Sequence, residues 1–462
     1  MTRSYGLSGK LDIGYKDYLF LTLTGRNDWV SVLAPENRSF FYPSATLSFV
    51  ANEALDFIKD VNQIDFLKLR GGLSKVGQVN IDPYSLVPTF SQAAGYPYNG
   101  IGGLSVGDQM VSASLKPEIT TQWEAGVDFS LYKNRVNAGF TYYDTKTKDQ
   151  TVATGVSSAT GFSSLLTNTG QTSSRGIEAT LSLTPLRTKD WDVTLSSNYA
   201  HYDNTVDYIS ADLSQLTLGA YGGTIGSYAE AGQQFPVLKG KTHVRDSQGR
   251  IIVNRITGYP SATTGISVLG QANAAHILGV NLNVSYKGFT LYGSGEYRSG
   301  NVIYNAGGGT FDFSGAGYNT GIYSRDRFVI PNSSYLDPAT NQYVANTNIT
   351  VRDGGPGYWT ISGPRTGINE NYVTSGAFWK IRELSLAYNL PNSVLAKTGF
   401  IKGARISVQG RNLFVFLPKT NVYTDPEYSD GNGLNSGNAI GLTNLGQTPP
   451  SRYYGATLTI NL

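Results

Sequence analysis

The sequence predicts an all-β fold, an antiparallel transmembrane β-barrel with long extracellular loops. Three observations support this prediction. Segments with alternating apolar and polar residues recur along the whole chain, the charges in these segments keep to one face, and short connections alternate with long ones. Because successive side chains of a strand point to opposite faces, each segment would have one apolar and one polar face. Such strands suit a wall between hydrocarbon and a water-filled interior.

The composition agrees with strands and turns. Among 462 residues there are 54 Gly, 31 Tyr and no Cys, and only 15% of residues are charged, which is low for a globular protein. The net charge of +3 is small for this length and no cluster of Lys and Arg stands out, so we expect no nucleic-acid partner. No apolar run is long enough for a membrane-spanning helix.

The first half of the chain contains most of the candidate strands. In order, they are residues 5–15, 19–26, 43–49, 67–73, 121–131, 136–142, 177–183 and 191–199. A tight turn at Lys16-Asp17 joins the first two, and another at 132–135 joins the fifth to the sixth. A short helical connection is predicted at 52–59.

The second half adds the remaining strands, for a total of about 13. They are residues 278–286, 289–295, 384–390, 404–410 and 454–462. The turn Lys287-Gly288 joins the first two of these. In the last strand, Leu458 and Ile460 alternate with Thr457 and Thr459, so the chain ends on a strand with one apolar face.

The positions of the charges discriminate better than hydrophobicity. Twelve charged residues fall on the polar face: Lys10, Asp12, Arg26, Lys68, Arg70, Glu124, Asp128, Glu178, Glu296, Arg298, Arg405 and Arg411. A Lys or Arg facing lipid near the midplane costs about 2–4 kcal/mol, so this one-sided pattern indicates a lipid-facing surface opposite. Lys380 and Arg382 share the apolar face of Leu384, and we place them at the outer rim, among lipid headgroups.

The lengths of the connections also alternate. Short links lie at 16–17, 132–135, 186–190, 287–288 and 391–403, and long ones at 78–119, 204–275, 299–377 and 417–451. Outer-membrane barrels have short periplasmic turns and longer extracellular loops. Counting back from a periplasmic C-terminus puts every short link on the periplasmic side.

Several segments resemble those of a known family, the SusC/RagA-like TonB-dependent transporters of Bacteroidetes. These segments are FLKLRGGLSKVG (66–77), LKPEITTQWEAGVDF (115–129), YYDTKTKD (142–149), NTGQ (168–171), RGIE (175–178), WKIRELSLAYNLP (379–391), GRNLF (410–414) and DPE (425–427). They occur in the family's order. The terminal residue departs from the usual aromatic, being Leu462.

The resemblance implies a barrel of about 22 strands in the outer membrane of a Gram-negative, Bacteroidetes-like bacterium. Residues 1–462 would be the C-terminal part of that barrel, with the signal peptide, accessory domain and plug upstream. It also implies import of oligosaccharides or peptides, with a SusD-like lipoprotein over the loops. Energy would come from TonB-ExbB-ExbD through the plug, and the barrel would contact outer-membrane lipid.

Two sets of residues are candidates for function. The candidate lumen-facing residues are Arg26, Arg70, Glu124, Asp128, Glu296, Arg298 and Arg411, which could bind substrate or instead solvate the lumen and pair with the plug. The candidate loop aromatics are Tyr96, Tyr98, Tyr318, Tyr323, Tyr358 and Trp359, which could stack on substrate or contact the lipoprotein, or instead pack the loops.

Motifs for catalysis or a cofactor are not found, so we predict that the protein is not an enzyme. The three histidines, His201, His243 and His276, lack metal-ligand spacing. The acidic segment 425–432 could hold Ca²⁺ through oxygen ligands, or simply form turns. Residues 307–309, all glycine, are interpreted as a flexible loop because no helix signal follows them.

Two other classes of protein remain alternatives. A passive porin, or another outer-membrane barrel that closes by itself, would conduct without TonB. A soluble β-rich fibre or adhesin would share the high Gly and Tyr content, but charges confined to one face are hard to explain when both faces meet water. The substrate does not follow from the sequence.

Overall fold

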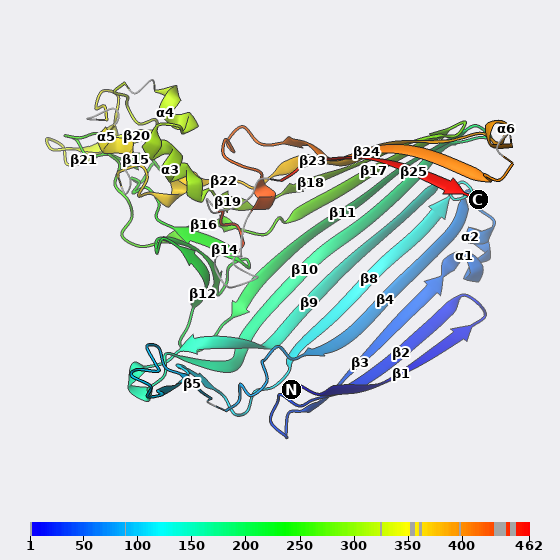
Figure 1. Ribbon diagram of the computed structural model, residues 1–462, viewed down its shortest axis with the longest axis horizontal. Coiled ribbons are helices and arrows are strands. Elements are labelled where there is room, and N and C mark those ends of the chain that lie inside the picture. The colour runs from blue at the N-terminus through cyan, green and yellow to red at the C-terminus, as the bar shows by residue number, and fades with distance from the viewer. Residues whose placement is uncertain are drawn as a thin grey trace. The chain divides into compact units, whose positions relative to one another are not determined.

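The computed structural model describes residues 2–87, 89–323, 326–351, 356–359, 363–396, 399–428, 440–443 and 450–462. One large antiparallel sheet dominates it (Figure 1). Its path runs β1 (Ser4–Tyr15), β2 (Leu19–Val30), β3 (Ser39–Val50), β4 (Ile64–Gln78), β8 (Glu118–Leu131), β9 (Val136–Gly155), β10 (Ser164–Arg187), β11 (Trp191–Tyr208), β17 (His276–Tyr286), β18 (Phe289–Ser299), β23 (Phe378–Asn389), β24 (Gly403–Phe416) and β25 (Tyr453–Asn461). A fourteenth strand, β7 (Gln109–Val111), pairs with β10 in parallel. All 13 predicted strands are confirmed.

The chain forms two compact units. The first comprises Met1–Leu216, Glu230–Gln234 and Leu278–Leu291. Its strands β3, β4 and β8 to β11 lie side by side, and the short helices α1 (Ala51–Ala54) and α2 (Asp56–Lys59) lie at the end opposite the small strand β5 (Phe90–Gln92) (Figure 1). β5 pairs with β6 (Leu104–Val106). The two helices confirm the predicted connection at 52–59.

The predicted hairpin turns have the backbone that tight turns require. Lys16 and Asp17 have φ of 48° and 59°, and Lys287 and Gly288 have φ of 42° and 92°. Two consecutive residues with positive φ match the right-handed twist of the flanking strands. The turn therefore fixes the register, which pairs Tyr15 with Leu19.

The second unit comprises Thr217–Ala229, Phe235–Ile277 and Tyr292–Leu462. Besides strands of the large sheet, it holds much of the long loops. Their strands are β12 (Gln215–Tyr221), β13 (Ile225–Glu230), β14 (Val237–Gly240), β15 (Ile251–Ile252), β16 (Ser267–Gln271), β19 (Val302–Tyr304), β20 (Ser333–Asp337), β21 (Gln342–Ala345) and β22 (Val373–Ser375). Their helices are α3 (Ala306–Ser314), α4 (Tyr318–Ile322) and α5 (Pro356–Trp359), and α6 (Asn392–Leu395) follows β23.

Two clusters of buried hydrophobic residues lie in these loops. One cluster contains Ile225, Leu238 and Tyr372, and a second contains Val253 and Val351. The apolar faces of the strands are exposed instead, as at Leu11 and Leu291. An extended apolar surface on a sheet is what a lipid-facing wall requires. Within the described ranges, no helix is long and apolar enough to cross a membrane.

Two features differ from the sequence prediction. β9 and β10 have 20 and 24 residues, whereas about 9–11 suffice to span a bilayer, so their polar ends continue the hairpin past the predicted limits. The prediction of a flexible loop at 307–309 is wrong, because these glycines lie inside helix α3. A Cβ on Gly308 would lie 2.4 Å from Cδ1 of Tyr372, so glycine lets the helix pack against this ring.

Candidate functional site on the polar face of the sheet

The residues on the polar face of the first unit form rows across neighbouring strands. Directly paired residues of an antiparallel sheet point to the same face, so the register defines each row. The row nearest the short turns is Phe66, Ser130, Asn137, Ser182 and Ser196. The second row is Lys68, Asp128, Gly139, Thr180 and Asn198, and the third is Arg70, Gly126, Thr141, Glu178 and Ala200.

Charged residues of these rows pair with one another. Lys68 Nζ lies 3.1 Å and Arg70 Nε 3.3 Å from Oδ2 of Asp128. Arg70 Nη1 lies 3.7 Å from Oε1 of Glu124, and Nη2 donates to the hydroxyl of Thr141. The structure thus brings three predicted lumen-facing residues together. Together with Lys68, these residues carry two positive and two negative charges, so this part of the wall carries little net charge.

Two glycines make this arrangement possible. A Cβ on Gly126 would lie 2.9 Å from Cζ of Arg70, so only glycine lets the guanidinium cross the strand to Thr141. A Cβ on Gly139 would lie 3.0 Å from Oδ1 of Asp128. The missing side chain at 139 leaves open space between Asp128 and Thr180.

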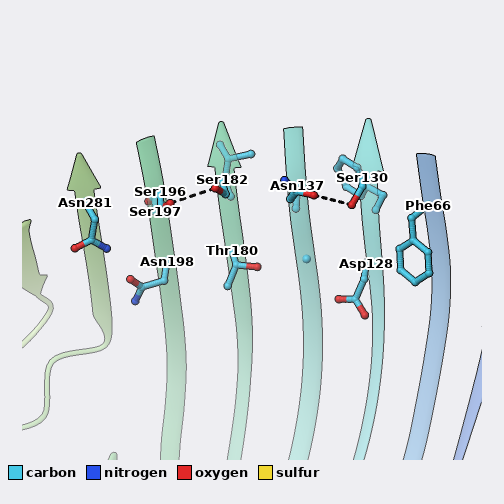
Figure 2. A pocket seen from close by; sticks show the side chains of 14 residues that line it. Phe66, Asp128, Ser130, Asn137, Thr180, Ser182, Ser196, Ser197, Asn198 and Asn281 are labelled. Carbon is cyan, nitrogen blue, oxygen red and sulfur yellow. Dashed lines mark hydrogen bonds between the residues drawn. The ribbon is translucent and has the colours of Figure 1, made fainter. Parts of the chain in front are cut away.

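That space belongs to a hollow of about 440 Å³ on the polar face. Figure 2 shows Asp128, Thr180 and Asn198 from the second row, with Ser130 and Asn137 from the first row beside them. The Ser130 hydroxyl donates to Asn137 Oδ1 at 2.7 Å, and the Ser182 and Ser196 hydroxyls lie 3.2 Å apart. The carboxylate of Asp128 is already paired with Lys68 and Arg70. The other polar groups of the hollow are hydroxyls and amides, which bind water or an uncharged polar chain.

A second charge cluster lies in the second unit. Glu296, predicted to face the lumen, accepts from Arg382 Nε at 2.7 Å and also from Arg298. Lys380 Nζ lies 2.7 Å from Oδ2 of Asp425 and also bonds Glu427. Placing Lys380 and Arg382 at the lipid-facing rim was therefore wrong, because both pair with carboxylates on the polar side.

A β-bulge explains the error. The register of β23 and β24 shifts between Ile381 and Glu383, and Asn412 of β24 has a left-handed φ of 53°. Beyond the shift, Trp379 pairs with Phe416 on the apolar face. The alternation of faces along β23 is therefore displaced by one residue, which moves Lys380 and Arg382 to the polar face. Bulges change the direction of side chains in this way without ending the strand.

The carboxylate of Glu427 is held ionised by its partners. Burial alone would raise its pKa, but hydrogen bonds from Arg382 and Lys380 outweigh burial and lower the pKa to about 2. The segment that carries Glu427 is thereby tied to β23. Of the remaining predicted lumen-facing residues, Arg26 pairs with Asp28 at 2.7 Å and Arg411 pairs with Glu383 at 3.1 Å.

The predicted loop aromatics divide into two groups. Tyr96, Tyr98 and Tyr318 are exposed, with 45%, 69% and 63% of their surface accessible. Tyr358 and Trp359 are only 4% and 6% accessible and pack with Val253, Ile330 and Val351. Tyr323 packs against the same cluster and stacks on Phe328, with the ring centroids 3.7 Å apart. The buried pair therefore fits loop packing, while the exposed three are free to meet a ligand or partner.

Sequence reasoning missed a buried polar group that supports the loops. Asp312, in helix α3, accepts from Arg365 Nε at 2.7 Å and from the Tyr372 hydroxyl at 2.9 Å. Burial alone would lower the pKa of Arg365, but Tyr358 and Asp312 outweigh it and raise that pKa. The three residues are up to 60 positions apart, and no local pattern links them. The glycine at 308 was the one available signal in the sequence, because it leaves room for the ring of Tyr372, which bonds Asp312.

The suggested Ca²⁺ segment receives no support from its described part. Asp425 and Glu427 are paired with Lys380, and Asp430 and Asn432 lie outside the described residues. Among the residues that the structure describes, no group of three or more His, Asp or Glu side chains could hold a metal ion.

The alternating faces, the exposed apolar surface and the paired charges opposite define a β-barrel wall of the outer membrane. Residues 1–238 match the family described as "TonB dependent receptor-like, beta-barrel". The chain belongs to this family, which excludes the soluble fibre. The expected location in the outer membrane is confirmed.

Curated relatives with the same family description match nearly the whole chain. TonB-dependent receptor P26 of Formosa agariphila is 27% identical across 98% of this chain and 45% of its own length. TonB-dependent receptor SusC of Bacteroides thetaiotaomicron is 24% identical across 92% of this chain and 41% of its own length. The resemblance to the SusC type is therefore confirmed, and both relatives are described as TonB-dependent receptors. The chain spans less than half the length of these relatives.

Solved structures show the same fold. The structure described as the RagAB peptide transporter aligns with a TM-score of 0.75 and 19% identity, covering 99% of this chain and 48% of that one. The RagAB peptide importer in the "open-open" state aligns equally well, with a TM-score of 0.75.

Proposed function

We propose that this chain is the barrel part of an active outer-membrane importer for oligosaccharides or peptides. The observation that carries the proposal is similarity to SusC along 92% of the chain, on a fold shared with a peptide transporter. The polar face is consistent with this role, because its charges are compensated and its hollow offers hydroxyl and amide groups. A polar substrate could pass such a wall without being held by unpaired charge.

A SusD-like lipoprotein is the proposed partner at the loops. Tyr96, Tyr98 and Tyr318 give the loops exposed aromatic side chains, which are common in protein and sugar interfaces. Energy would come from the proton gradient through TonB-ExbB-ExbD, acting on a plug domain.

Uptake measurements test the proposal. In a Bacteroidetes host, cells with the intact gene should accumulate labelled oligosaccharides or peptides, and cells that lack the gene or tonB should not. Addition of an uncoupler should stop uptake. Uptake that continues without tonB and with the uncoupler would show a passive porin instead.

A further inference from the structure

The second unit contains a cavity of about 690 Å³ within its loops, and none of the wall residues named above lines it. Its lining comes from segments far apart in the chain, among them the end of β12, the residue after β14, the first turns of α3 and residues 363–369. A volume of this size is typical of small-molecule sites. It would hold a ligand of a few sugar or amino-acid units.

Lys241 is fixed at the wall of this cavity. Its backbone N–H donates to Asn369 Oδ1 at 2.9 Å, and its carbonyl accepts from the N–H of Glu370 at 3.1 Å. Asn369 is itself 4% exposed and also donates to Thr224 Oγ1 at 3.4 Å. Because both backbone groups are bonded, the starting point of the Lys241 side chain is rigid.

The described lining of the cavity carries a single formal charge. Among the described residues that line it, Lys241 alone is ionisable to a charged form at neutral pH. The neighbouring carboxylate, Glu370, is already engaged, since it accepts from Arg245 Nη2 at 2.7 Å and from the N–H of His243 at 2.9 Å. An ammonium group in such a site attracts an anionic ligand group.

The other lining groups define the rest of the ligand. Thr224, Thr310 and Thr366 bring hydroxyl groups, and the rings of Tyr221 and Tyr304 lie 6.4 Å apart at one side. Glycines occupy much of the remaining wall, so backbone amides can approach a ligand closely. Hydroxyls and amides suit a polar chain next to the anionic group.

We propose that this cavity binds a carboxylate-bearing unit of the imported chain, with Lys241 as the specificity-determining residue. The inference rests on the proposed import function and narrows its substrate class. The same carboxylate chemistry occurs in a uronic-acid oligosaccharide and at the free C-terminus of a peptide.

Binding to the purified chain in detergent tests this. The probes are tri-galacturonate with its methyl ester, and penta-alanine with its C-terminal amide. For one of these pairs, the carboxylate form should bind at least about tenfold more tightly than the neutral form, since hydrogen bonds to charged groups are strong. The pair that shows the preference identifies the source of the carboxylate.

Two variants make the test specific. Lys241→Met keeps the backbone contacts and should abolish the preference, whereas Lys241→Arg keeps the charge and should retain it. Lys59→Met, on the short helix α2, is the matched control and should change nothing. Equal binding of charged and neutral forms, no binding of either carboxylate, or a preference that survives in Lys241→Met would overturn the inference.

Failure of the inference is distinguishable from failure of the proposed function. TonB-dependent uptake without any carboxylate preference would support the proposed import function and contradict the carboxylate site. A clear preference for the carboxylate in the purified chain, without TonB-dependent uptake by cells, would support the site and contradict the import function.

Discussion

Arg382 and Glu427 form a two-pronged ion pair, in which Nη1 donates to Oε2 at 2.7 Å and Nη2 donates to Oε1. Arg382 belongs to β23, whereas Glu427 follows β24 in a loop. The geometry matches a planar guanidinium with both carboxylate oxygens, which adds direction to the charge attraction. The pair therefore fastens a loop to the wall of the sheet.

Glu427→Gln should loosen this loop. The amide loses one charge-assisted acceptor and leaves Arg382 and Lys380 undercompensated, so we expect a local cost of about 1–3 kcal/mol. Hydrogen exchange of the segment around Glu427 is the measurement, and exchange should become faster there. Asp12→Asn is the control, since Asp12 and Lys10 are 57% and 62% exposed and such pairs contribute little. Unchanged exchange in Glu427→Gln would contradict the fastening role.

The same pair predicts a dependence on pH. The pKa of Glu427 falls from an ordinary 4.5 to about 2 in the folded protein. A lowered pKa means that the stabilisation is complete above pH 4.5 and is lost as pH falls towards 2. Protease protection of the loop should decrease over this window in the wild type. Glu427→Gln should lack this step, and a step of equal size in both proteins would exclude Glu427 as its origin.

The strands could be predicted because one physical rule, lipid on one face and water on the other, acts on every residue of the wall. It holds for β1, which was predicted to begin at Tyr5 and begins at Ser4. It failed at Lys380, because the bulge at Asn412 depends on contacts between strands. The alternation of residues within one strand does not reveal a shift in register between two strands.

The loops followed different rules. Asp312, Arg365 and Tyr372 are distant in sequence, and each is an ordinary loop residue until the fold joins them. Of the candidate lumen-facing residues, Glu124 and Asp128 both pair with Arg70. Whether these residues contact substrate stays a prediction.

Val127→Arg tests the lipid-facing surface. Val127 pairs with Leu69 and Phe140 on the apolar face, so a charge there would meet hydrocarbon at a cost of about 2–4 kcal/mol. The matched control is Gln122→Arg in the same strand, on the polar face beside Glu124. Unfolding by urea in lipid vesicles measures both. Equal destabilisation by the two variants would refute the assignment of faces.

Gly126→Ala should displace Arg70 from Thr141. The new Cβ would lie 2.9 Å from both Arg70 Cζ and the carbonyl oxygen of Phe140, and such overpacking costs about 1–3 kcal/mol. Thermal unfolding in detergent gives the change in stability. Gly9→Ala serves as the control, because nothing lies within 4 Å of its Cβ position. If Gly126→Ala is as stable as the control, the glycine is not required for the crossing of Arg70.

Adjacent glycines of helix α3 give the sharpest comparison in the loops. A Cβ on Gly308 would lie 2.4 Å from Tyr372, whereas a Cβ on Gly309 finds its nearest atom at 3.9 Å. Alanine favours a helix over glycine by about 1 kcal/mol, so Gly309→Ala should stabilise α3 or leave it unchanged. Gly308→Ala should instead push the helix off Tyr372 and weaken the bond from its hydroxyl to Asp312. Hydrogen exchange of α3 should therefore rise only in Gly308→Ala, and a similar rise in both variants would mean that the glycines provide flexibility and not close packing.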